Sequence, residues 1–390
     1  MSELSYLEKL LDGVEVEWLS LGELGDFICG NGLQKKDFVE SGFPAIHYGQ
    51  IYTRYGLSAD KTFTYVLPEL ANKLRKAQKN DLLLATTSEN DEDVVKPLAW
   101  LGDNVAISGD MMLFRHEQNV KYLAYFFQSE IFQTQKMKYI TGAKVRRVSS
   151  GDLSKIKIPI PSSNNPEKSL TIQSEIVRIL DKFTALTAEL TAELTAELTM
   201  RKKQYNYYRD QLLSFDEGEV EWKMLGDLGE NLDSKRKPIT SGLREAGSIP
   251  YYGASGIVDY VKDYIFDGDF LLISEDGANL LARNTPIAFS ISGKSWVNNH
   301  AHVIKFDSYA ERRYVEYYLN SIDLAPYISG AAQPKLNKKN LESIRIPNPS
   351  PEDKERIVSI LDKFDALTNS INEGLPREIE LRQKQYEYYR

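Results

Sequence analysis

The residues of this chain that could do chemistry are few and scattered. His300 and His302 have the spacing of a metal-ligand pair, but no cysteine or carboxylate cluster accompanies them in the sequence. Gly293-Lys294-Ser295 has the ending of a phosphate-binding loop, yet Ala288 stands where the first glycine is required. Pro351-Glu352-Asp353-Lys354 has the acids and lysine of a nuclease fragment, but acids also favour the first turn of a helix. We expect structural roles for all three segments.

A fourth segment, Phe27–Gly32 (FICGNG), is faintly similar to the glycine turn that methyltransferases place under S-adenosylmethionine. No Asn-Pro-Pro-aromatic segment follows that would hold a target base, and an ordinary turn explains the glycines. The sequence also contains no Gly-x-Ser-x-Gly and no His-Glu-x-x-His segment. We therefore predict a chain without catalysis of its own and without a bound metal.

Length and composition indicate a soluble globular protein of two or three domains. The 390 residues are 42% hydrophobic and 27% charged, and an aromatic content of 11% is too high for a largely disordered chain. Cys29 is the single cysteine, which excludes an intramolecular disulfide and any zinc site with several cysteines. The N-terminus is acidic, and no apolar run approaches the roughly 20 residues that cross a bilayer. We expect a cytoplasmic protein.

The chain repeats itself in four blocks, which occur in the same order in two copies. The pairs are VEWLSLGELG (16–25) with VEWKMLGDLG (220–229), LSKIKIPIP (153–161) with LESIRIPNP (341–349), ILDKFTALT (179–187) with ILDKFDALT (360–368), and RKKQYNYYR (201–209) with RQKQYEYYR (382–390). The last two pairs share an offset of 181 residues, so they belong to one continuous element. The larger offsets of the first two pairs, 204 and 188, show that the first copy has a longer variable part.

The duplication is also circular. Residues 210–219 (DQLLSFDEGE) precede the second VEW, and residues 7–15 (LEKLLDGVE) precede the first. The chain thus begins inside a repeat and ends at Arg390, where the first copy continues. We expect residues 1–13 to be an N-terminal piece that completes the circular repeat.

The element with the constant offset is predicted to be a long amphipathic helix. Apolar residues recur every three or four positions at seven matching places: Ile176, Ile179, Phe183, Leu186, Leu190, Leu194 and Leu198 in the first copy, and Ile357, Ile360, Phe364, Leu367, Ile371, Leu375 and Ile379 in the second. This stripe is typical of a coiled-coil seam, and its natural partner is the other copy. The first helix should span about 167–213, with three TAEL tetrads at 187–198 as a helical spacer. Gly374-Leu375-Pro376 should kink or interrupt the second helix.

The parts that precede the helices are predicted to be two globular domains of mixed α/β (α+β) structure. β-rich runs such as 81–85 and 269–273 alternate with short helical patterns and with Gly, Asn and Ser turns. We place head one at residues 14–158, long helix one at 159–215, head two at 216–346 and long helix two at 347–390. Two related but diverged heads suggest two related but different targets.

Basic residues gather at equivalent places in the two heads, although the net charge of the chain is −8. Head one ends with Lys144, Arg146, Arg147, Lys155 and Lys157, and the matching stretch of head two has Lys335, Lys338, Lys339 and Arg345. A second set is Lys35 and Lys36 in head one, and Lys235, Arg236, Lys237 and Arg244 in head two. Any one cluster could be a solvated face. Because the clusters recur in both copies, we interpret them as candidate DNA-binding surfaces that contact phosphates.

Tyrosines form a second repeated cluster, at the end of each long helix. Tyr205, Tyr207 and Tyr208 recur as Tyr386, Tyr388 and Tyr389. Residues at this spacing cover more than one face of a helix, so some must contact something besides the partner helix. They are candidates either for packing on a head of the same chain or for docking another subunit.

The whole arrangement resembles the specificity (S, HsdS) subunit of type I restriction–modification enzymes. The resemblance covers essentially the entire chain, and its most specific pieces are the two ILDKF-x-ALT blocks, the two KQY-x-YYR blocks, the L-x-x-I-x-I-P-x-P exit from each head and the tandem TAEL. The TAEL repeat points to the IC group of that family. The resemblance implies two target-recognition domains separated by two long antiparallel coiled-coil helices, in a circular pseudo-two-fold repeat.

The resemblance also implies a function and partners. Each head would read one half of a split, asymmetric DNA sequence in double-stranded DNA, and the helices would set the spacing and dock two methyltransferase (M) subunits. The M subunits would bind S-adenosylmethionine and methylate adenine N6, and restriction (R) subunits, attached through the M subunits, would add an ATP- and Mg-dependent nuclease. No cofactor would be bound by this chain.

A second interpretation belongs to a different class of protein. The chain could be a coiled-coil scaffold, without affinity for DNA, that carries two protein- or sugar-binding heads. The net negative charge supports this alternative, and a DNA-binding assay with and without an M subunit separates the two.

Overall fold

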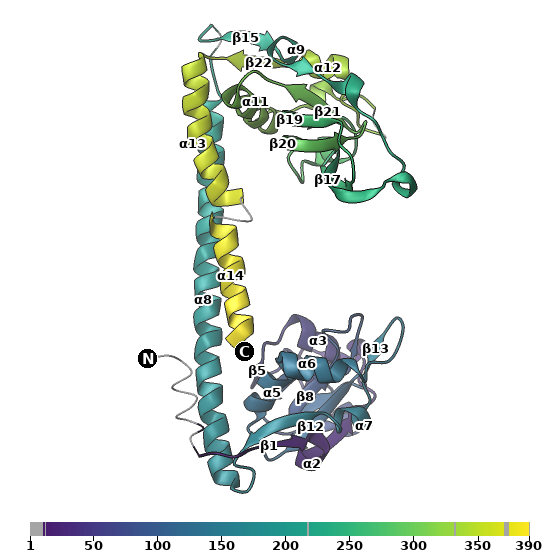
Figure 1. Cartoon of the computed structure of the whole chain (residues 1–390). Coiled ribbons are helices and arrows are strands. Elements are labelled where there is room, and N and C mark those ends of the chain that lie inside the picture. The colour runs from purple at the N-terminus through teal and green to yellow at the C-terminus, as the bar shows by residue number, and fades with distance from the viewer. Residues whose placement is uncertain (1–10, 12, 217, 331–332, 370–373, 390) are drawn as a thin grey trace. The chain divides into compact units, whose positions relative to one another are not determined.

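The computed structural model describes residues 11, 13–216, 218–330, 333–369 and 374–389, apart from the side chains of Tyr386, Tyr388 and Tyr389. The expected N-terminal piece, 1–13, lies almost entirely outside the described residues. The chain divides into two compact units, Met1–Leu190 with Arg382–Arg390, and Thr191–Leu381. Each unit combines a mixed α/β head with helical segments (Figure 1), and each is described by itself.

Head one contains two five-stranded sheets. The first has the order β2-β12-β8-β10-β5, built from Gly25–Cys29, Met111–His116, Leu82–Ala85, Lys96–Trp100 and Ser58–Ala59. The second has the order β3-β6-β4-β11-β7, built from Phe38–Val39, Thr64–Val66, Phe43–Ile46, Val105–Ile107 and Lys76–Ala77. The β10–β5 and β11–β4 pairs are parallel and the remaining pairs are antiparallel.

The run of leucines in β8 explains why this strand lies at the centre of head one. All four of its residues are buried. Because successive side chains of a strand point to opposite faces, Leu82 and Leu84 belong to one hydrophobic cluster and Leu83 and Ala85 to another. Short helices complete the head: α2 (Leu21–Leu24), η1 (Lys35–Asp37), α3 (Tyr48–Thr53), α4 (Pro68–Ala71), α5 (Val120–Gln128), α6 (Glu130–Met137) and α7 (Ser150–Leu153).

Head two forms one six-stranded sheet instead. Its order is β16-β21-β19-β20-β17-β18, from Glu230–Asn231, Ala301–Lys305, Phe266–Ser274, Ala288–Val297, Ala246–Gly253 and Gly256–Val261. The β17–β20 pair is parallel and the others are antiparallel. Leu271 and Ile273 of β19 face one cluster and Leu272 faces another, as in β8. The helices are α9 (Leu225–Leu228), η2 (Asp233–Lys235), η3 (Ser241–Leu243), α10 (Asn279–Ala282), α11 (Tyr309–Ser321), η4 (Ala325–Tyr327) and α12 (Lys338–Glu342).

Both heads are closed by the same two-stranded pairing of their first and last strands. In head one, β1 (Val16–Ser20) pairs antiparallel with β14 (Lys157–Pro161). In head two, β15 (Glu221–Met224) pairs antiparallel with β22 (Arg345–Asn348). These strands are the VEW and I-x-I-P repeat blocks, so the repeated sequence forms the frame from which each head leads into its long helix.

The first long helix has the predicted bounds, and in the second a new helical segment begins at Gly374-Leu375-Pro376, as predicted. The helix α8 (Pro166–Leu212) is continuous, and it contains all three TAEL tetrads. The second helix is divided into α13 (Pro351–Asn369) and α14 (Gly374–Tyr389). Pro376 lies in the first turn of α14, where a proline is tolerated because its missing N–H is not needed.

In the second unit, α8 and α13 run antiparallel, as predicted. The ring of Phe364 lies 5.7 Å from that of Tyr208 and 6.5 Å from that of Tyr205, measured between ring centres. Near the start of α13, Ile357 lines the same cavity as Leu212. Residue numbers therefore rise along α13 as they fall along α8. Within the described residues, no helix is long and apolar enough to cross a membrane.

Candidate nucleic-acid interface

In head one, the two basic segments lie on different elements. Lys35 and Lys36 form most of η1 and are exposed. Arg146 and Arg147 form β13, which pairs antiparallel with β9 (Thr87–Ser88) directly after the central strand β8. Lys144 lies in the exposed turn that leads into β13.

His47 and Asp110 connect these two segments. Burial, and secondly the charge of Lys35, hold the pKa of His47 below its ordinary value, while Asp110 acts in the opposite direction. Asp110 in turn lies 3.9 Å from the guanidinium of Arg147. The charges of Lys35 and of Asp110 therefore both act on His47, and Asp110 lies close to Arg147.

The cations of head one differ in how far they are already neutralised. Arg146 Nε lies 2.8 Å from Asp91 Oδ1, and its guanidinium also donates to the carbonyl of Gly142. Lys155 lies 2.8 Å from Asp152 and stacks over Tyr139, at the start of the β14 exit rather than at β13. In the part of the chain that the structure describes, Lys35, Lys36 and Lys144 form no ion pair, which leaves them available for phosphates.

The corresponding segments of head two converge on one carboxylate. Lys235 ends η2, and Arg236 and Lys237 follow it. Arg236 lies 2.6 Å from one oxygen of Glu275, and Lys335 lies 3.1 Å from the other. Glu275 follows the central strand β19, so the two basic segments of head two meet at the end of the central strand.

Arg236 is nevertheless a structural residue. Its side chain is 12% exposed, and it contacts Asp233, Glu275 and the carbonyl of Ala301. His302 completes this network, with Nδ1 2.6 Å from Asp233 and Nε2 2.7 Å from the carbonyl of Leu336. Burial acts to raise the pKa of Asp233 and of Glu275, but hydrogen bonds and charges from His302 and Arg236 outweigh it and lower both. The position of Arg236 does not favour the phosphate-binding role assigned to it from the sequence.

The expectation that no carboxylates accompany His302 is wrong. Asp233, Glu275 and His302 place one possible ligand atom each within 4.8 Å of one another, which is close enough to hold a metal ion. Arg236 and Lys335 already supply the positive charge that these carboxylates need, so the donors are used within the fold. No sequence pattern indicates this cluster, because Asp233 and Glu275 lie 69 and 27 residues from His302.

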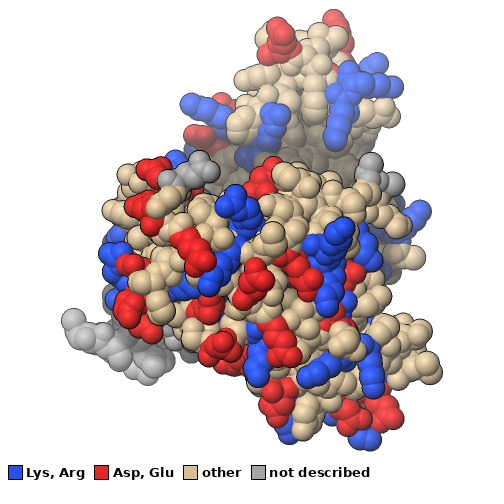
Figure 2. Space-filling view, turned by 90° about the horizontal axis from the view of Figure 1, so that it is seen from above, with Lys and Arg blue, Asp and Glu red and all other residues tan. Residues whose placement is uncertain are grey.

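Two further candidates lie on α12 at the end of head two. Lys338 lies 3.6 Å from Glu342, one turn further along the same helix. Lys339 is exposed and forms no ion pair with any described residue. On the face of the molecule seen in Figure 2, Lys and Arg side chains are interspersed with Asp and Glu.

The other segments singled out in the sequence have structural positions. Cys29 and Gly30 lie at the end of β2, and Gly293–Ser295 lies within β20. Glu352 and Asp353 lie in the first turn of α13, where the hydroxyl of Ser350 accepts from the backbone N–H of Asp353. None of these segments is assembled with other reactive groups among the described residues.

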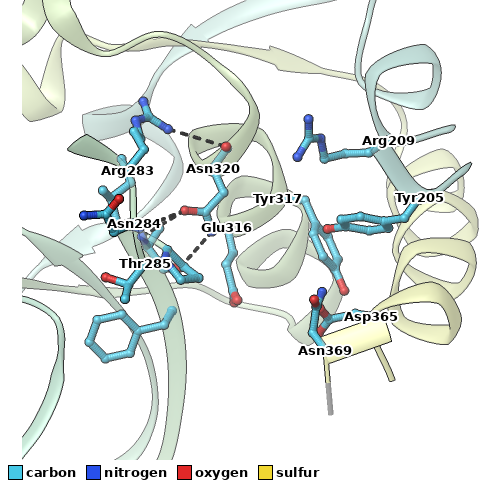
Figure 3. A pocket seen from close by; sticks show the side chains of 14 residues that line it. Tyr205, Arg209, Arg283, Asn284, Thr285, Glu316, Tyr317, Asn320, Asp365 and Asn369 are labelled. Atoms are coloured by element: carbon cyan, nitrogen blue, oxygen red, sulfur yellow. Dashed lines mark hydrogen bonds between the residues drawn. The ribbon is translucent and has the colours of Figure 1, made fainter. Parts of the chain in front are cut away.

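The tyrosine cluster divides between the two roles considered for it. Tyr205 is half-buried, and burial raises its pKa to about 12. It lines a cavity of about 370 Å³ in the second unit, together with Arg209, Glu316 and Asp365 (Figure 3). Tyr207 is 61% exposed and touches Tyr208. Tyr205 thus packs within the unit, whereas Tyr207 presents an aromatic ring to solvent. The side chains of Tyr386, Tyr388 and Tyr389 lie outside the described residues.

Two globular heads, each closed by a repeated strand pair and followed by a copy of the repeated long helix, define a subunit of modular construction. The family model for the type I restriction modification DNA specificity domain matches residues 13–200 and again 217–381. The chain therefore belongs to the family of type I restriction–modification DNA specificity subunits, whose part in such systems is sequence recognition and not catalysis.

Curated relatives match along nearly their full lengths. The EcoR124I/EcoR124II specificity subunit of Escherichia coli is 41% identical over 415 residues, which cover 100% of this chain and 96% of the relative. The EcoprrI specificity subunit of Escherichia coli is 39% identical over 392 residues, which cover 96% of this chain and 93% of the relative.

Solved structures support the fold at low sequence identity. A chain from a study of complex assembly and conformational transition of the type I R-M system has a TM-score of 0.63 at 15% identity, covering 96% of each chain. The HsdS subunit of Thermoanaerobacter tengcongensis has a TM-score of 0.55 at 16% identity, covering 96% of this chain and 95% of that one.

Proposed function

We propose that this chain recognises a split, asymmetric site in double-stranded DNA, with one head on each half-site. The observation that carries the proposal is that in head two the segments of Arg236 and Lys335, about a hundred residues apart, meet at Glu275 after the central strand. In head one, Arg147 lies 3.9 Å from Asp110, and the charges of Asp110 and of Lys35 both act on His47. Residues 14–158 and 216–346 are then the target-recognition domains, 159–215 and 347–390 the spacing helices, and 1–13 the piece that completes the circular repeat.

The phosphate contacts are assigned to the exposed cations. These are Lys35, Lys36, Lys144 and Arg147 in head one, and Lys235, Lys237 and Lys339 in head two. Such contacts fix the position of a protein on the duplex without reading its sequence, so the bases are read by other side chains of the same surface. Lys155, Lys335, Lys338 and Arg146 each lie within 3.6 Å of a carboxylate oxygen and contribute less.

In this proposal the long helices dock two methyltransferase (M) subunits. Tyr207 is the favoured docking residue because its aromatic ring is exposed. Restriction (R) subunits join through the M subunits. S-adenosylmethionine, ATP and Mg belong to those partners, and the complex works in the cytoplasm. The tandem TAEL favours the IC group within the family.

The experiment is to assemble the chain with its M subunit and sequence the adenines that the complex methylates. Two fixed half-sites, separated by a spacer of constant length and free sequence, are the expected result. Gel shifts on mixed duplex DNA, with and without the M subunit, test binding alone. A chain that never binds DNA, even in the complex, would favour the scaffold alternative.

A further inference from the structure

We propose that Asp181 and Asp362, the aspartates of the two ILDKF blocks, are positioning residues that lock each head onto its long helix in one orientation. The inference rests on the proposed function, because orientation matters if the two heads must reach half-sites at a fixed spacing. Each aspartate belongs to a group of three residues that we call the head clamp. The head clamp consists of Lys121, Tyr125 and Asp181 in the first copy, and of Arg313, Tyr317 and Asp362 in the second.

In the first copy, the clamp joins α5 of head one to α8. The ammonium of Lys121 donates to both oxygens of Asp181, at 2.6 and 2.5 Å. The hydroxyl of Tyr125 donates to one of the same oxygens at 2.8 Å. Lys121 and Tyr125 are four residues apart, so both lie on one face of α5.

In the second copy, the clamp joins α11 of head two to α13. Arg313 donates to Asp362 Oδ1 from two nitrogens, at 3.1 and 3.0 Å, and the hydroxyl of Tyr317 donates to the same oxygen at 2.7 Å. Tyr309 adds a bond of 2.8 Å to the other oxygen. Figure 1 shows α11 beside α13 within this unit.

The two clamps are equivalent in sequence as well as in geometry. KYLAYFFQS (121–129) aligns with RYVEYYLNS (313–321), which matches cation with cation and tyrosine with tyrosine at an offset of 192 residues. The aspartates are 181 residues apart, so the chain between the clamp partners is eleven residues longer in the first copy. The same contact is present in both copies although the segment between the head residues and the aspartate differs in length. This indicates that the contact itself is the required feature.

A second tether lies eight residues before each aspartate, about two turns along the same helix. In the first copy Gln173, fully buried, accepts from the backbone N–H of Asn119 at 2.9 Å, at the start of α5. In the second copy Lys354, 6% exposed, donates to Glu311 at 2.7 Å, in the first turn of α11. One attachment point would allow the head to pivot, whereas two points along one helix fix its direction.

Apolar packing alone would hold a head on its helix without fixing that direction. Ile357, Val358 and Leu361 of α13 already pack in the core of head two. Hydrophobic contact is non-directional, but charge-assisted hydrogen bonds are strongly directional. The clamp therefore selects one orientation out of those that packing permits, and with it the distance between the two reading surfaces.

The test uses the full chain assembled with M subunits, carrying Asp181→Ala or Asp362→Ala. Alanine keeps the helix intact, since it has the highest helix propensity. Lys182→Ala and Lys363→Ala are the matched controls, because they make the same change at the exposed neighbouring position of each ILDKF block. The readout is the distribution of spacer lengths among methylated sites, which a drop in stability alone would not shift.

We expect the share of sites with a spacer one base pair longer or shorter to rise roughly tenfold in the aspartate variants, as removal of a charge-assisted bond implies. Both half-sites should stay unchanged, and the lysine variants should match the unmodified chain. A spacer distribution that does not move would overturn the inference.

If an alanine variant cannot modify DNA because it unfolds, the Tyr125→Phe and Tyr317→Phe variants provide the test instead, since each removes one hydroxyl from the clamp. The distribution of spacer lengths among the sites that these variants methylate must then broaden. An unchanged distribution would overturn the inference. The unmodified complex is sequenced alongside. If it methylates a bipartite site while the clamp variants behave identically, only the clamp inference fails; if it methylates no bipartite site, the proposed function fails as well.

Discussion

The two heads share the strand pair that frames them and differ in the sheets that lie within this frame. Both are closed by the same strand pair, β1 with β14 and β15 with β22, and both are fixed to their helices through an aspartate of the ILDKF block. Inside the frame, head one has two five-stranded sheets where head two has one of six strands. The repeated sequence therefore lies where the head must be positioned, and the divergent sequence lies where a target would be read.

The heads also differ in how they use buried charge. Head two has a buried network around Arg236, Asp233, Glu275 and His302 beneath its basic surface. Among the described residues of head one, the buried ammonium is that of Lys136, which donates to the backbone carbonyls of Glu92 and Val94 at 2.8 and 2.9 Å. Changes to these two sites should therefore affect the two heads differently.

The largest expected effect is on the stability of head two. Arg236→Ala removes one partner of a buried ion network and leaves two carboxylates under-compensated, which typically costs about 3–5 kcal/mol. The adjacent exposed Lys237→Ala should change the free energy of unfolding by less than about 0.5 kcal/mol. Chemical denaturation monitored by hydrogen exchange should locate the destabilisation in head two. An equal effect in head one, or none in either, would contradict the network's role.

The buried ammonium of Lys136 should add its own pH dependence to the stability of head one. Burial lowers the pKa of Lys136 from 10.5 to about 8, so between these values this group binds fewer protons in the folded head than in the unfolded chain. Its contribution to stability should therefore rise as the pH goes from about 8 to 10.5, by on the order of 3 kcal/mol. Lys136→Met should abolish this rise, whereas Lys138→Met, at an exposed position of the same segment, should keep it. Denaturant unfolding across that pH range makes the measurement.

Binding of the assembled complex to DNA should depend on the basic residues of β13. Replacing Lys144, Arg146 and Arg147 together by Ala should weaken binding and reduce the slope of log K against log salt by roughly one for each phosphate that the variant no longer neutralises. We expect a reduction of about two rather than three, because Arg146 is already paired with Asp91. An unchanged salt slope would mean that this cluster is merely solvated.

Much of the architecture was predictable from the sequence because repeats and helical periodicity are local signals. The bounds of α8, the interruption before Pro376 and the antiparallel run of α13 against α8 are confirmed. The charge networks were not predictable, because Glu275, which pairs with Arg236, and Asp110, which lies near Arg147, are 39 and 37 residues away in the sequence. The clamp partners were missed although KYLAYFFQS and RYVEYYLNS are similar, because their offset of 192 matches none of the four repeated blocks.

The central claim is that α8 sets the spacing between two independently reading heads, and one TAEL tetrad tests it. A tetrad adds about 6 Å and a net rotation of about 40° to a helix. One base pair of B-DNA advances about 3.4 Å and turns roughly 35°. Rotation should dominate, because a head must face the groove before its side chains reach base edges, whereas a small axial misfit can be absorbed by bending of the DNA.

The measurement is therefore the methylated site recovered from cells that carry a variant with two TAEL tetrads together with its M subunit. The account predicts a spacer shorter by one base pair and two unchanged half-sites, because the deletion lies in the helix and alters neither head. An unaltered spacer, or an altered half-site, would show that something other than this helix positions the heads.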